Sequence, residues 1–322
     1  MSGPRRAAGV DLGGTKIHSL VTTEEGRVLG EDRCLTQAWE GPDAVIGRIV
    51  SSLRRALEAA GLTTQDIVGV GISSPGPCDP VRGVVTNAPN LLGWHEVPLA
   101  RLVSEGLGVP ALLENDANAA AYGELRFGAC RGLLHIVYVT LGTGIGGGLI
   151  IDGRIYEGAS GAAGEVGHIV IDEDGPPCNC GSRGCLEALA SGPAIAREAA
   201  AALEAGRSPL LAELVGKEQP TPELVLQAAV QGDATAREII ERAGYHLGVG
   251  LTGLLNCFNP QALILGGGLV GLGDLYLGPA VRTARERAFA QIVADATITT
   301  AELGERAGAL GAAALVMENA IR

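Results

Sequence analysis

The sequence carries little positive charge for its length. Of its 322 residues, 24 are Lys or Arg and 36 are Asp or Glu, so the formal net charge at pH 7 is −12. We therefore expect no nucleic-acid partner, because phosphates are attracted by a basic face and repelled by an acidic one. A small anionic ligand is not excluded, since backbone amides and a metal ion can supply local positive charge.

Aromatic residues are also scarce, at 3%, whereas glycine is abundant, with 49 residues, and the hydrophobic residues amount to 47%. This apolar content excludes an intrinsically disordered chain, which has too few apolar residues to bury. A chain of this length can bury a large core, and the length predicts roughly two domains.

The chain lacks the features of an exported or membrane protein. No long apolar run precedes Asp11, so we expect no secretion signal. The longest uncharged stretch, residues 133–151, could span a membrane by length, but its five glycines favour a buried strand–turn–strand. The seven cysteines are odd in number and three lie within eight residues, a pattern typical of a reducing cytoplasm and a metal site. We expect a cytoplasmic protein with no membrane partner.

Short apolar runs alternate with longer helical patterns, which predicts an α/β protein with more than one sheet. The predicted strands are Ala8–Val10, Ile17–Val21, Val68–Ile72, Ala111–Leu113, Ile136–Thr140, Gly148–Ile151, His168–Ile171 and Ala262–Leu265. Helical patterns cover about residues 43–60, 233–256, 273–292 and 304–321, and further helices begin at Ser191 and Thr221. We expect a smaller N-terminal α/β domain over residues 1–117 and a larger C-terminal α/β domain with the cysteine loop over 118–303. The last helix, about residues 304–322, could pack back on the first domain.

Two glycine-rich turns resemble each other. DLGGTKIHSLV near the start and TLGTGIGGGLI in the middle both read as strand, glycine turn and strand, with Thr15 and Thr143 in the turns. Such turns present several backbone N–H groups to one point, which suits phosphate oxygens, so the pair could hold a nucleotide. A third glycine turn, Gly266–Gly268, could let an adenosine approach the backbone. The alternative is that these glycines only make tight turns.

Two common nucleotide-binding motifs are missing or out of context. No Walker A loop is present. Gly142, Gly144 and Gly147 satisfy the GxGxxG spacing, but a dinucleotide fold needs a helix after the glycines. Here an apolar strand-like run follows, and then the turn signal Asp152-Gly153. A nicotinamide oxidoreductase is therefore a disfavoured alternative.

Three cysteines and one histidine have the composition of a zinc site. Cys178, Cys180 and Cys185 follow His168 by 10, 12 and 17 residues. Four such ligands close a tetrahedron around Zn²⁺, and a closed site is structural rather than water-activating. We interpret the cluster as a staple for the loop that ends at Glu187. The alternative is a set of buried free thiols beside an unrelated histidine.

Polar residues between a predicted strand and a predicted helix are candidates for chemistry. Asp116 could take a proton from a substrate hydroxyl, and Asn115 could hold that substrate by donating and accepting hydrogen bonds. The alternative is helix capping, which both residue types often perform. Glu165 and Glu187 flank the cysteine loop, where carboxylate oxygens could accept sugar hydroxyl protons.

Four motifs together carry a family resemblance. Residues 155–168, IYEGASGAAGEVGH, match LxxGxxGxxGExGH with Ile155 in place of Leu, and residues 178–187, CNCGSRGCLE, match CxCGxxGCxE. DLGGTK at residues 11–16 and LGTGIGGG at residues 141–148 resemble the two phosphate motifs of actin-like ATPases. The chain thus resembles the ROK family (repressors, open reading frames and sugar kinases), in particular its bacterial glucokinases. Family repressors carry an N-terminal DNA-binding domain, which we do not expect here because the first motif begins at residue 11.

The resemblance implies a two-lobed actin-like ATPase (ribonuclease H-like) fold with the active site in the interdomain cleft. It implies ATP-dependent phosphorylation of glucose at the 6-hydroxyl, with Mg²⁺ beside the ATP and Asp116 as the catalytic base. Positions that match the family's sugar ligands are Asn90, Asn115, Asp116, Glu165, His168 and Glu187. Positions that match its ATP site are Asp11, Gly13, Gly14, Thr15, Lys16, Thr143, Gly144, Gly266 and Gly267. The structural Zn²⁺ would be held by His168, Cys178, Cys180 and Cys185.

The resemblance leaves several functional alternatives. The sugar could be N-acetylglucosamine, mannose or fructose instead of glucose, and the donor could be polyphosphate instead of ATP. A non-catalytic sugar-binding regulator is the alternative from a different class, and the presence of Asp116 argues against it. Such kinases are often homo-oligomers, so we expect a dimer or a tetramer.

Overall fold

The chain folds into two compact units, each made from separate stretches of sequence. A computed structural model describes residues 5–88 and 91–319. The first unit comprises Met1–Tyr138, Gly148–Ala163 and Ala301–Arg322, and the second comprises Val139–Gly147 and Gly164–Thr300. Two strands, β9 (Ile136–Leu141) and β10 (Ile145–Ile151), therefore run across the boundary between the units.

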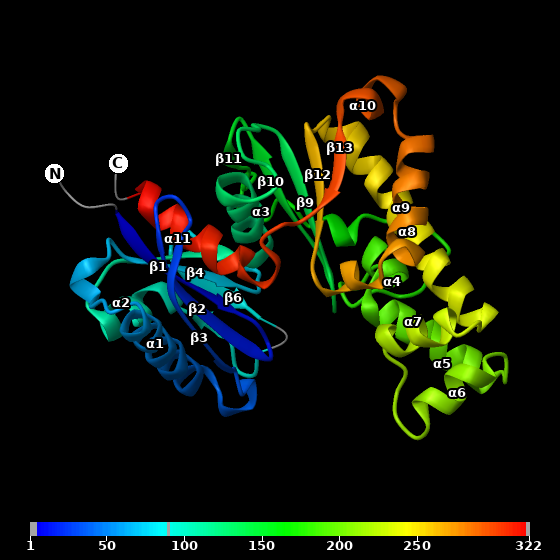
Figure 1. Cartoon of the computed structure of the whole chain (residues 1–322), viewed down its shortest axis with the longest axis horizontal. Helices are drawn as coiled ribbons and strands as arrows, with labels where there is room; N and C mark the ends of the chain where they lie inside the picture. The colour runs from blue at the N-terminus through cyan, green and yellow to red at the C-terminus, as the bar shows by residue number, and fades with distance from the viewer. Residues whose placement is uncertain (1–4, 89–90, 320–322) are drawn as a thin grey trace. The chain divides into compact units, whose positions relative to one another are not determined.

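The first unit is built on a five-stranded sheet in the order β3–β2–β1–β4–β8 (Figure 1). Its strands are β1 (Arg6–Leu12), β2 (Lys16–Thr23), β3 (Val28–Leu35), β4 (Val70–Ser74) and β8 (Ala111–Asn115). The strands β1, β2 and β3 pair antiparallel, whereas β4 and β8 run parallel to β1. The carboxyl ends of β1, β4 and β8 therefore lie at one edge, where Asp11 pairs with Ser73 and Ser73 pairs with Glu114.

Helices cover both faces of this sheet (Figure 1). The apolar face of α1 (Pro42–Ala59) packs on β2 and β3, and α11 (Ala307–Asn319) packs on β1 and β4. The approach of α11 is so close that the sheet needs glycine beneath it. A Cβ at Gly9 would lie 1.9 Å from the carbonyl oxygen of Ala309, and Gly71 is constrained in the same way.

The helix α3 (Asp116–Phe127) follows β8 directly and packs along α11. The first unit also contains a small sheet that sequence analysis did not predict. That sheet has the order β5–β6–β7 and consists of β5 (Cys78–Asp79), β6 (Val84–Asn87) and β7 (His95–Val97), followed by α2 (Leu99–Leu107). Buried Trp94 packs with the apolar residues of this region.

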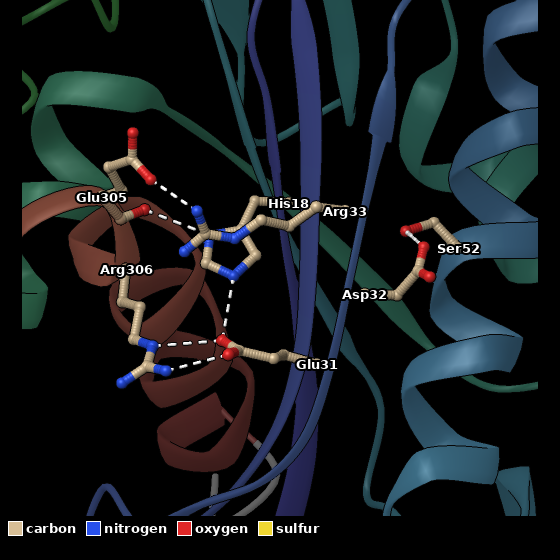
Figure 2. A network of polar contacts seen from close by, with 7 residues as sticks. All are labelled: His18, Glu31, Asp32, Arg33, Ser52, Glu305 and Arg306. Carbon is tan, nitrogen blue, oxygen red and sulfur yellow. Dashed lines mark hydrogen bonds and ion pairs between the residues drawn. The ribbon is translucent and has the colours of Figure 1, made fainter.

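A polar network holds the turn before α11 against β2 and β3, as Figure 2 shows. Arg306 donates to both carboxylate oxygens of Glu31, at 2.9 and 3.1 Å, and the same carboxylate lies 3.3 Å from Nε2 of His18. The other ring nitrogen of His18 lies 3.2 Å from the backbone oxygen of Glu305, whose side chain pairs with Arg33 at 2.6 Å. These contacts fix where α11 begins, and therefore which of its residues reach the edge of the sheet.

The second sheet has the order β11–β10–β9–β12–β13. Its remaining strands are β11 (Arg154–Ile155), β12 (Ala262–Gly266) and β13 (Thr297–Thr300). The predicted strand–turn–strand is confirmed, because β9 ends at Leu141 and β10 begins at Ile145 without an intervening helix. This arrangement removes the structural basis for a Rossmann-type dinucleotide site at the GxGxxG spacing.

Helices make up most of the second unit. They are α4 (Leu186–Ala190), α5 (Gly192–Glu204), α6 (Pro209–Val215), α7 (Pro222–Val230), α8 (Ala234–Phe258), α9 (Asp274–Arg287) and α10 (Ala290–Asp295). The long helix α8 packs against α4, α5, α7 and α9. Across the described residues, every helix is either too short or too polar to cross a membrane.

Two secondary-structure predictions in this unit are wrong. The expected strand 168–171 is instead the end of a short 3-10 helix, η3 (Val166–His168), followed by a single bridge between Val170 and Cys185. Ile169 and Val170 are exposed there, so the apolar run is not a buried strand. The expected helix over 273–292 is interrupted at Ala288, which is extended, and a new helix begins where the Asn256 side chain accepts the backbone N–H of Phe289.

Candidate functional site

Acidic side chains gather at the carboxyl edge of the first sheet. Asp11 lies near the end of β1, Glu114 lies on β8, and Asp116 opens α3 directly after β8. The parallel register brings these positions to the same edge. In α/β proteins this edge is where ligands bind, because loops and helix starts open there.

Asp11 is held by neighbours on the sheet and on α11. The Ser73 hydroxyl donates a hydrogen bond of 2.5 Å to Oδ1 of Asp11. A Cβ at Gly308 would lie 2.7 Å from the same oxygen, so glycine is needed in the first turn of α11. Burial raises the pKa of Asp11, and the hydrogen bond from Ser73 opposes part of that change.

Asp116 carries a more basic carboxylate than an exposed aspartate does. Its pKa is raised to about 6, first because burial disfavours the charged form and second because the charge of Asp11 is close. The backbone N–H of Ala117 donates to Oδ1 of Asp116 at 2.8 Å and favours the charged form in part. The group is therefore mainly ionised at pH 7 and has a pKa suited to accepting a proton near that pH.

Asn115 caps the helix that Asp116 begins. Its Oδ1 accepts hydrogen bonds from the backbone N–H groups of Ala117 at 3.0 Å and Asn118 at 3.2 Å. The helix-capping alternative therefore describes what this oxygen does. The Nδ2 group of Asn115 is the part of the amide that remains able to donate to a ligand.

The first glycine turn, between β1 and β2, exposes its backbone. The N–H of Gly13 donates to the carbonyl of Lys16 at 2.9 Å and closes the turn, and the Thr36 hydroxyl donates to the carbonyl of Gly13 at 2.6 Å. Gly14, Thr15 and Lys16 are exposed. Amides in such a turn suit the predicted role in binding phosphate oxygens.

The second glycine turn, in the second unit, closes in a comparable way. The N–H of Gly142 donates to the carbonyl of Gly144 at 2.9 Å, and Thr143 between them is exposed. Gly267 follows β12 with φ 88°, and a Cβ there would lie 2.3 Å from the carbonyl oxygen of Leu141. Only glycine fits at that close approach. The turn after β12 therefore has no side chain at position 267 to cover its backbone.

Glu187 connects the second glycine turn with α4. Its Oε2 accepts a hydrogen bond from the backbone N–H of Ile145 at 2.9 Å. A Cβ at Gly144 would lie 2.6 Å from the same oxygen. One carboxylate oxygen is therefore committed to the backbone, and this bond limits how the Glu187 side chain can turn.

His168 and the three cysteines converge on one point. The ligand atoms of His168, Cys178, Cys180 and Cys185 all lie within 4.8 Å of one another. Nδ1 of His168 lies 3.7 Å from Sγ of Cys178, and the Sγ atoms of Cys180 and Cys185 are also 3.7 Å apart. Zn–S bonds of about 2.3 Å in a tetrahedron place sulfurs about 3.8 Å apart, so both the donor set and the spacing fit Zn²⁺.

The second ring nitrogen of His168 faces away from the cysteines. Nε2 lies 3.9 Å from a carboxylate oxygen of Glu165, three residues earlier at the start of η3. With Nδ1 directed at the sulfur of Cys178, Nε2 and the Glu165 carboxylate lie together on the other side of the ring. Asn90, the remaining predicted sugar-binding residue, lies outside the described residues.

The structure brings the predicted residues together in two groups, one in each unit. The first unit holds Asp11, Gly13, Gly14, Thr15, Lys16, Asn115 and Asp116, and the second holds Thr143, Gly144, Glu165, His168, Cys178, Cys180, Cys185, Glu187, Gly266 and Gly267. Within the second group, Gly266 is buried as the last residue of β12.

Sequence analysis missed two residues that contact Asp11: Ser73, which donates a hydrogen bond to it, and Gly308, which leaves room for its carboxylate. Ser73 stands in the segment ISSPGP, where a serine at the end of a strand before Pro-Gly-Pro was a usable signal. Gly308 gave no local signal, because its close neighbour Asp11 lies far away in the sequence. Sequence analysis also assigned no role to Glu114, which directly precedes Asn115.

Comparison with known proteins gives consistent matches over the chain. The model of the ROK family matches residues 7–319. A glucokinase of Thermotoga maritima is 38% identical over 311 residues, which cover 96% of both chains. A putative xylose repressor of Caldicellulosiruptor sp. is 34% identical and covers 97% of this chain, and the match covers 78% of the repressor.

Solved structures give the same result in three dimensions. The crystal structure of a ROK family glucokinase from Streptomyces griseus in complex with glucose and AMPPNP matches with a TM-score of 0.81 and 37% identity. The match covers 97% of this chain and 99% of that structure. Both the sequence and the arrangement of elements are therefore similar over almost the whole length.

Proposed function

The chain belongs to the ROK family, and on that premise we propose that it phosphorylates glucose at the 6-hydroxyl with ATP as donor. Its two α/β sheets are of the actin-like ATPase type and match ROK kinase structures. The observation that carries the proposal is the environment of Asp116. This partly buried carboxylate with a pKa of about 6 stands at the carboxyl ends of the parallel strands β1, β4 and β8, in a chain 38% identical to a glucokinase.

In the proposed reaction Asp116 accepts the proton of the sugar hydroxyl. As the proton leaves, the hydroxyl oxygen attacks the γ-phosphorus of ATP, and the bond between that phosphorus and the bridging oxygen of ADP breaks. A base with a pKa near the working pH accepts the proton and still exists mainly as carboxylate. Asn115 donates from Nδ2 to the sugar, because its Oδ1 is occupied by the helix cap.

The two glycine turns are proposed to bind the phosphates of ATP. Their accessible amides would stabilise the charge that develops on the transferred phosphoryl oxygens. Mg²⁺, when bound, neutralises phosphate charge. Carboxylate oxygen is the donor type this ion takes in proteins, and Asp11, fixed at the sheet edge by Ser73, fits a role in holding its coordinated water.

In the second unit, Glu165, His168 and Glu187 are proposed to bind sugar hydroxyls. The distances among His168 and the three cysteines support a structural Zn²⁺ that orients the imidazole. A metal-bound histidine keeps its other nitrogen in one direction, so the zinc acts on sugar affinity through His168 and not on the phosphoryl transfer itself.

A second candidate function is sugar binding without catalysis, as part of a regulator. The observation that favours it is the 34% identity to a putative xylose repressor. The raised pKa of Asp116 favours the kinase, because perturbed pKa values are typical of groups that transfer protons in active sites.

The deciding experiment measures ADP formation with a panel of sugars. Glucose, mannose, fructose and N-acetylglucosamine are each tested with ATP and with polyphosphate, and the product is identified by ³¹P and ¹³C NMR. We expect glucose with ATP to give the highest kcat/KM and a product phosphorylated at the 6-hydroxyl. Sugar binding by calorimetry without formation of a sugar phosphate from either donor would contradict the kinase and support the regulator. Light scattering on the same preparation tests the expected dimer or tetramer.

A further inference from the structure

Glu114 is a buried carboxyl group that the reaction above does not use. It lies on β8 with 6% of its surface exposed, directly before Asn115. Its Oε1 accepts two hydrogen bonds, from the backbone N–H of Asn115 at 2.9 Å and from Nδ2 of Asn118 at 3.0 Å. A single oxygen atom therefore ties the end of β8 to the first turn of α3.

The contact with Asn118 matters because that amide has little else to hold it. Asn118 is 4% exposed, and its Oδ1 has no hydrogen-bond partner among the described residues. Its backbone N–H donates to the cap oxygen of Asn115. The bonds of Glu114 and the cap of Asn115 thus close the same turn, and Asp116 lies inside that turn.

The negative charge of Glu114 is not what makes this contact useful. Burial, together with the nearby carboxylate of Glu157, raises the pKa of Glu114 to about 7. Glu114 also lines a cavity of about 530 Å³. The titratable and charged groups that face it there or lie near it are Cys78, Tyr122, Arg154, Glu157 and Glu318. A carboxyl oxygen accepts hydrogen bonds whether or not the group carries its proton, so the contacts persist through neutral pH.

We propose that Glu114 is a positioning residue for Asp116, whose carboxylate projects from the turn that the acceptor oxygen of Glu114 closes. The proposal rests on the proposed kinase function and adds to it a residue that need not touch the sugar or the nucleotide. Without this oxygen, the start of α3 loses two of the bonds that hold it. A displacement of about 1 Å in a reacting group can cost about 100-fold in rate, so the effect falls on turnover.

Two substitutions separate the acceptor oxygen from the charge. Glu114→Gln keeps a carbonyl oxygen that can accept both bonds and removes the charge, whereas Glu114→Leu keeps a similar volume and removes the acceptor. Glu124 provides the matched control. It is a fully buried glutamate on α3 whose carboxylate accepts the backbone N–H groups of Ala129 and Leu303, at the other end of the helix.

We expect turnover to fall in E114L and to be retained in E114Q. E114L lowers kcat by about 100-fold while the KM for the sugar changes by less than about tenfold. E114Q keeps kcat within about threefold of the wild type, because the acceptor is restored. E124L melts at a lower temperature and keeps kcat. The proposal is overturned if E114L keeps its kcat, if E114Q falls as far as E114L, or if E124L loses kcat equally.

A measurement that does not depend on turnover tests the role of Glu114 separately from the proposed kinase function. In protein labelled with ¹³C at aspartate carboxyl groups, the resonance of Asp116 is assigned by its loss in D116N, and its titration is followed by NMR. We expect E114L to shift the apparent pKa of Asp116 or broaden its resonance, and E124L to leave both unchanged. If wild-type protein formed no ADP with any sugar, the proposed kinase function would fail, but the titration would still test whether Glu114 positions Asp116. An unchanged titration of Asp116 in E114L would overturn the positioning role of Glu114.

Discussion

The two regions that carry the candidate residues are built by different physical means. In the first unit the carboxylates stand on or directly after strands, where the register of β1, β4 and β8 and the bond from Ser73 to Asp11 set their positions. In the second unit the loop around His168 has little regular structure: one 3-10 turn and the isolated bridges Val170–Cys185 and Pro177–Arg183.

This difference shows which interactions each region depends on. The carboxylate edge is formed by the fold itself, and its burial is seen in the raised pKa of Asp116. The cysteine loop brings four ligand atoms together outside any long helix or strand, which is expected where a metal supplies part of the stabilisation. Removing a charge should therefore affect chemistry in the first region, whereas removing the metal should loosen structure in the second.

The largest expected effect comes from Asp116→Asn. The amide cannot accept the hydroxyl proton, so kcat should fall by about 10³-fold, while glucose binding by calorimetry stays within about threefold. Because the amide has nearly the size of the carboxylate and removes a charge that burial disfavours, the melting temperature should not decrease. Near-normal turnover of D116N would refute the assignment of Asp116 as the base.

Removal of the metal site should affect the second region and leave the first intact. Cys180→Ser should raise the KM for glucose by about 10–100-fold and lower the melting temperature, because His168 loses its orientation. Cys257→Ser is the control, since Cys257 is exposed on α8 and outside the cluster. Metal content by mass spectrometry should fall in C180S only; equal affinity and melting in both variants would count against the zinc staple.

The pH dependence of kcat/KM should report the carboxylate edge. Asp116 is active as a carboxylate and its pKa is raised to about 6, so protonation below that pH removes the base. We expect kcat/KM to fall about tenfold per pH unit below pH 6 and to level off above it. If the acidic fall of kcat/KM had its midpoint near pH 4, Asp116 would titrate as an exposed aspartate does, which would contradict its burial.

The smallest expected effect concerns the surface part of the network that holds α11. The Arg33 and Glu305 side chains are 46% and 69% exposed, so their pair is screened by solvent. Arg33→Ala should change the free energy of unfolding by about 0–1 kcal/mol and leave kcat unchanged. A double-mutant cycle with Glu305→Ala, measured by denaturant unfolding, isolates the pair; a coupling well above this range would show that the network matters more than its exposure suggests.

Local patterns in the sequence were sufficient for many of the elements. The helix predicted over 43–60 is found as α1, and the pattern over 233–256 is found as α8, because the apolar residues of both recur at helical spacing. The cap at Ser191 and the proline after it mark the start of α5. The glycines of GTGIGGG predicted a turn between strands because a following apolar run offered no helix signal.

Other features depend on contacts that no local pattern encodes. The strand β3 was not predicted, since three consecutive charged residues, Glu31, Asp32 and Arg33, stand in its middle and interrupt any apolar pattern. The glycine at 308 is required by a carboxylate near the other end of the chain. The segment after His168 is apolar and still exposed, because its path is set by the cysteine cluster and not by burial. The four cluster residues themselves were predictable, because their residue types and spacing are those of a zinc site.

The central claim is that the carboxylate of Asp116 receives the proton of a sugar hydroxyl during phosphoryl transfer. A crystal structure with glucose and a non-hydrolysable ATP analogue tests it most directly. The account predicts the 6-hydroxyl oxygen within about 3 Å of a carboxylate oxygen of Asp116, with the γ-phosphate on the far side of that hydroxyl. Glucose bound with a different hydroxyl, or with no hydroxyl, at that carboxylate would contradict it.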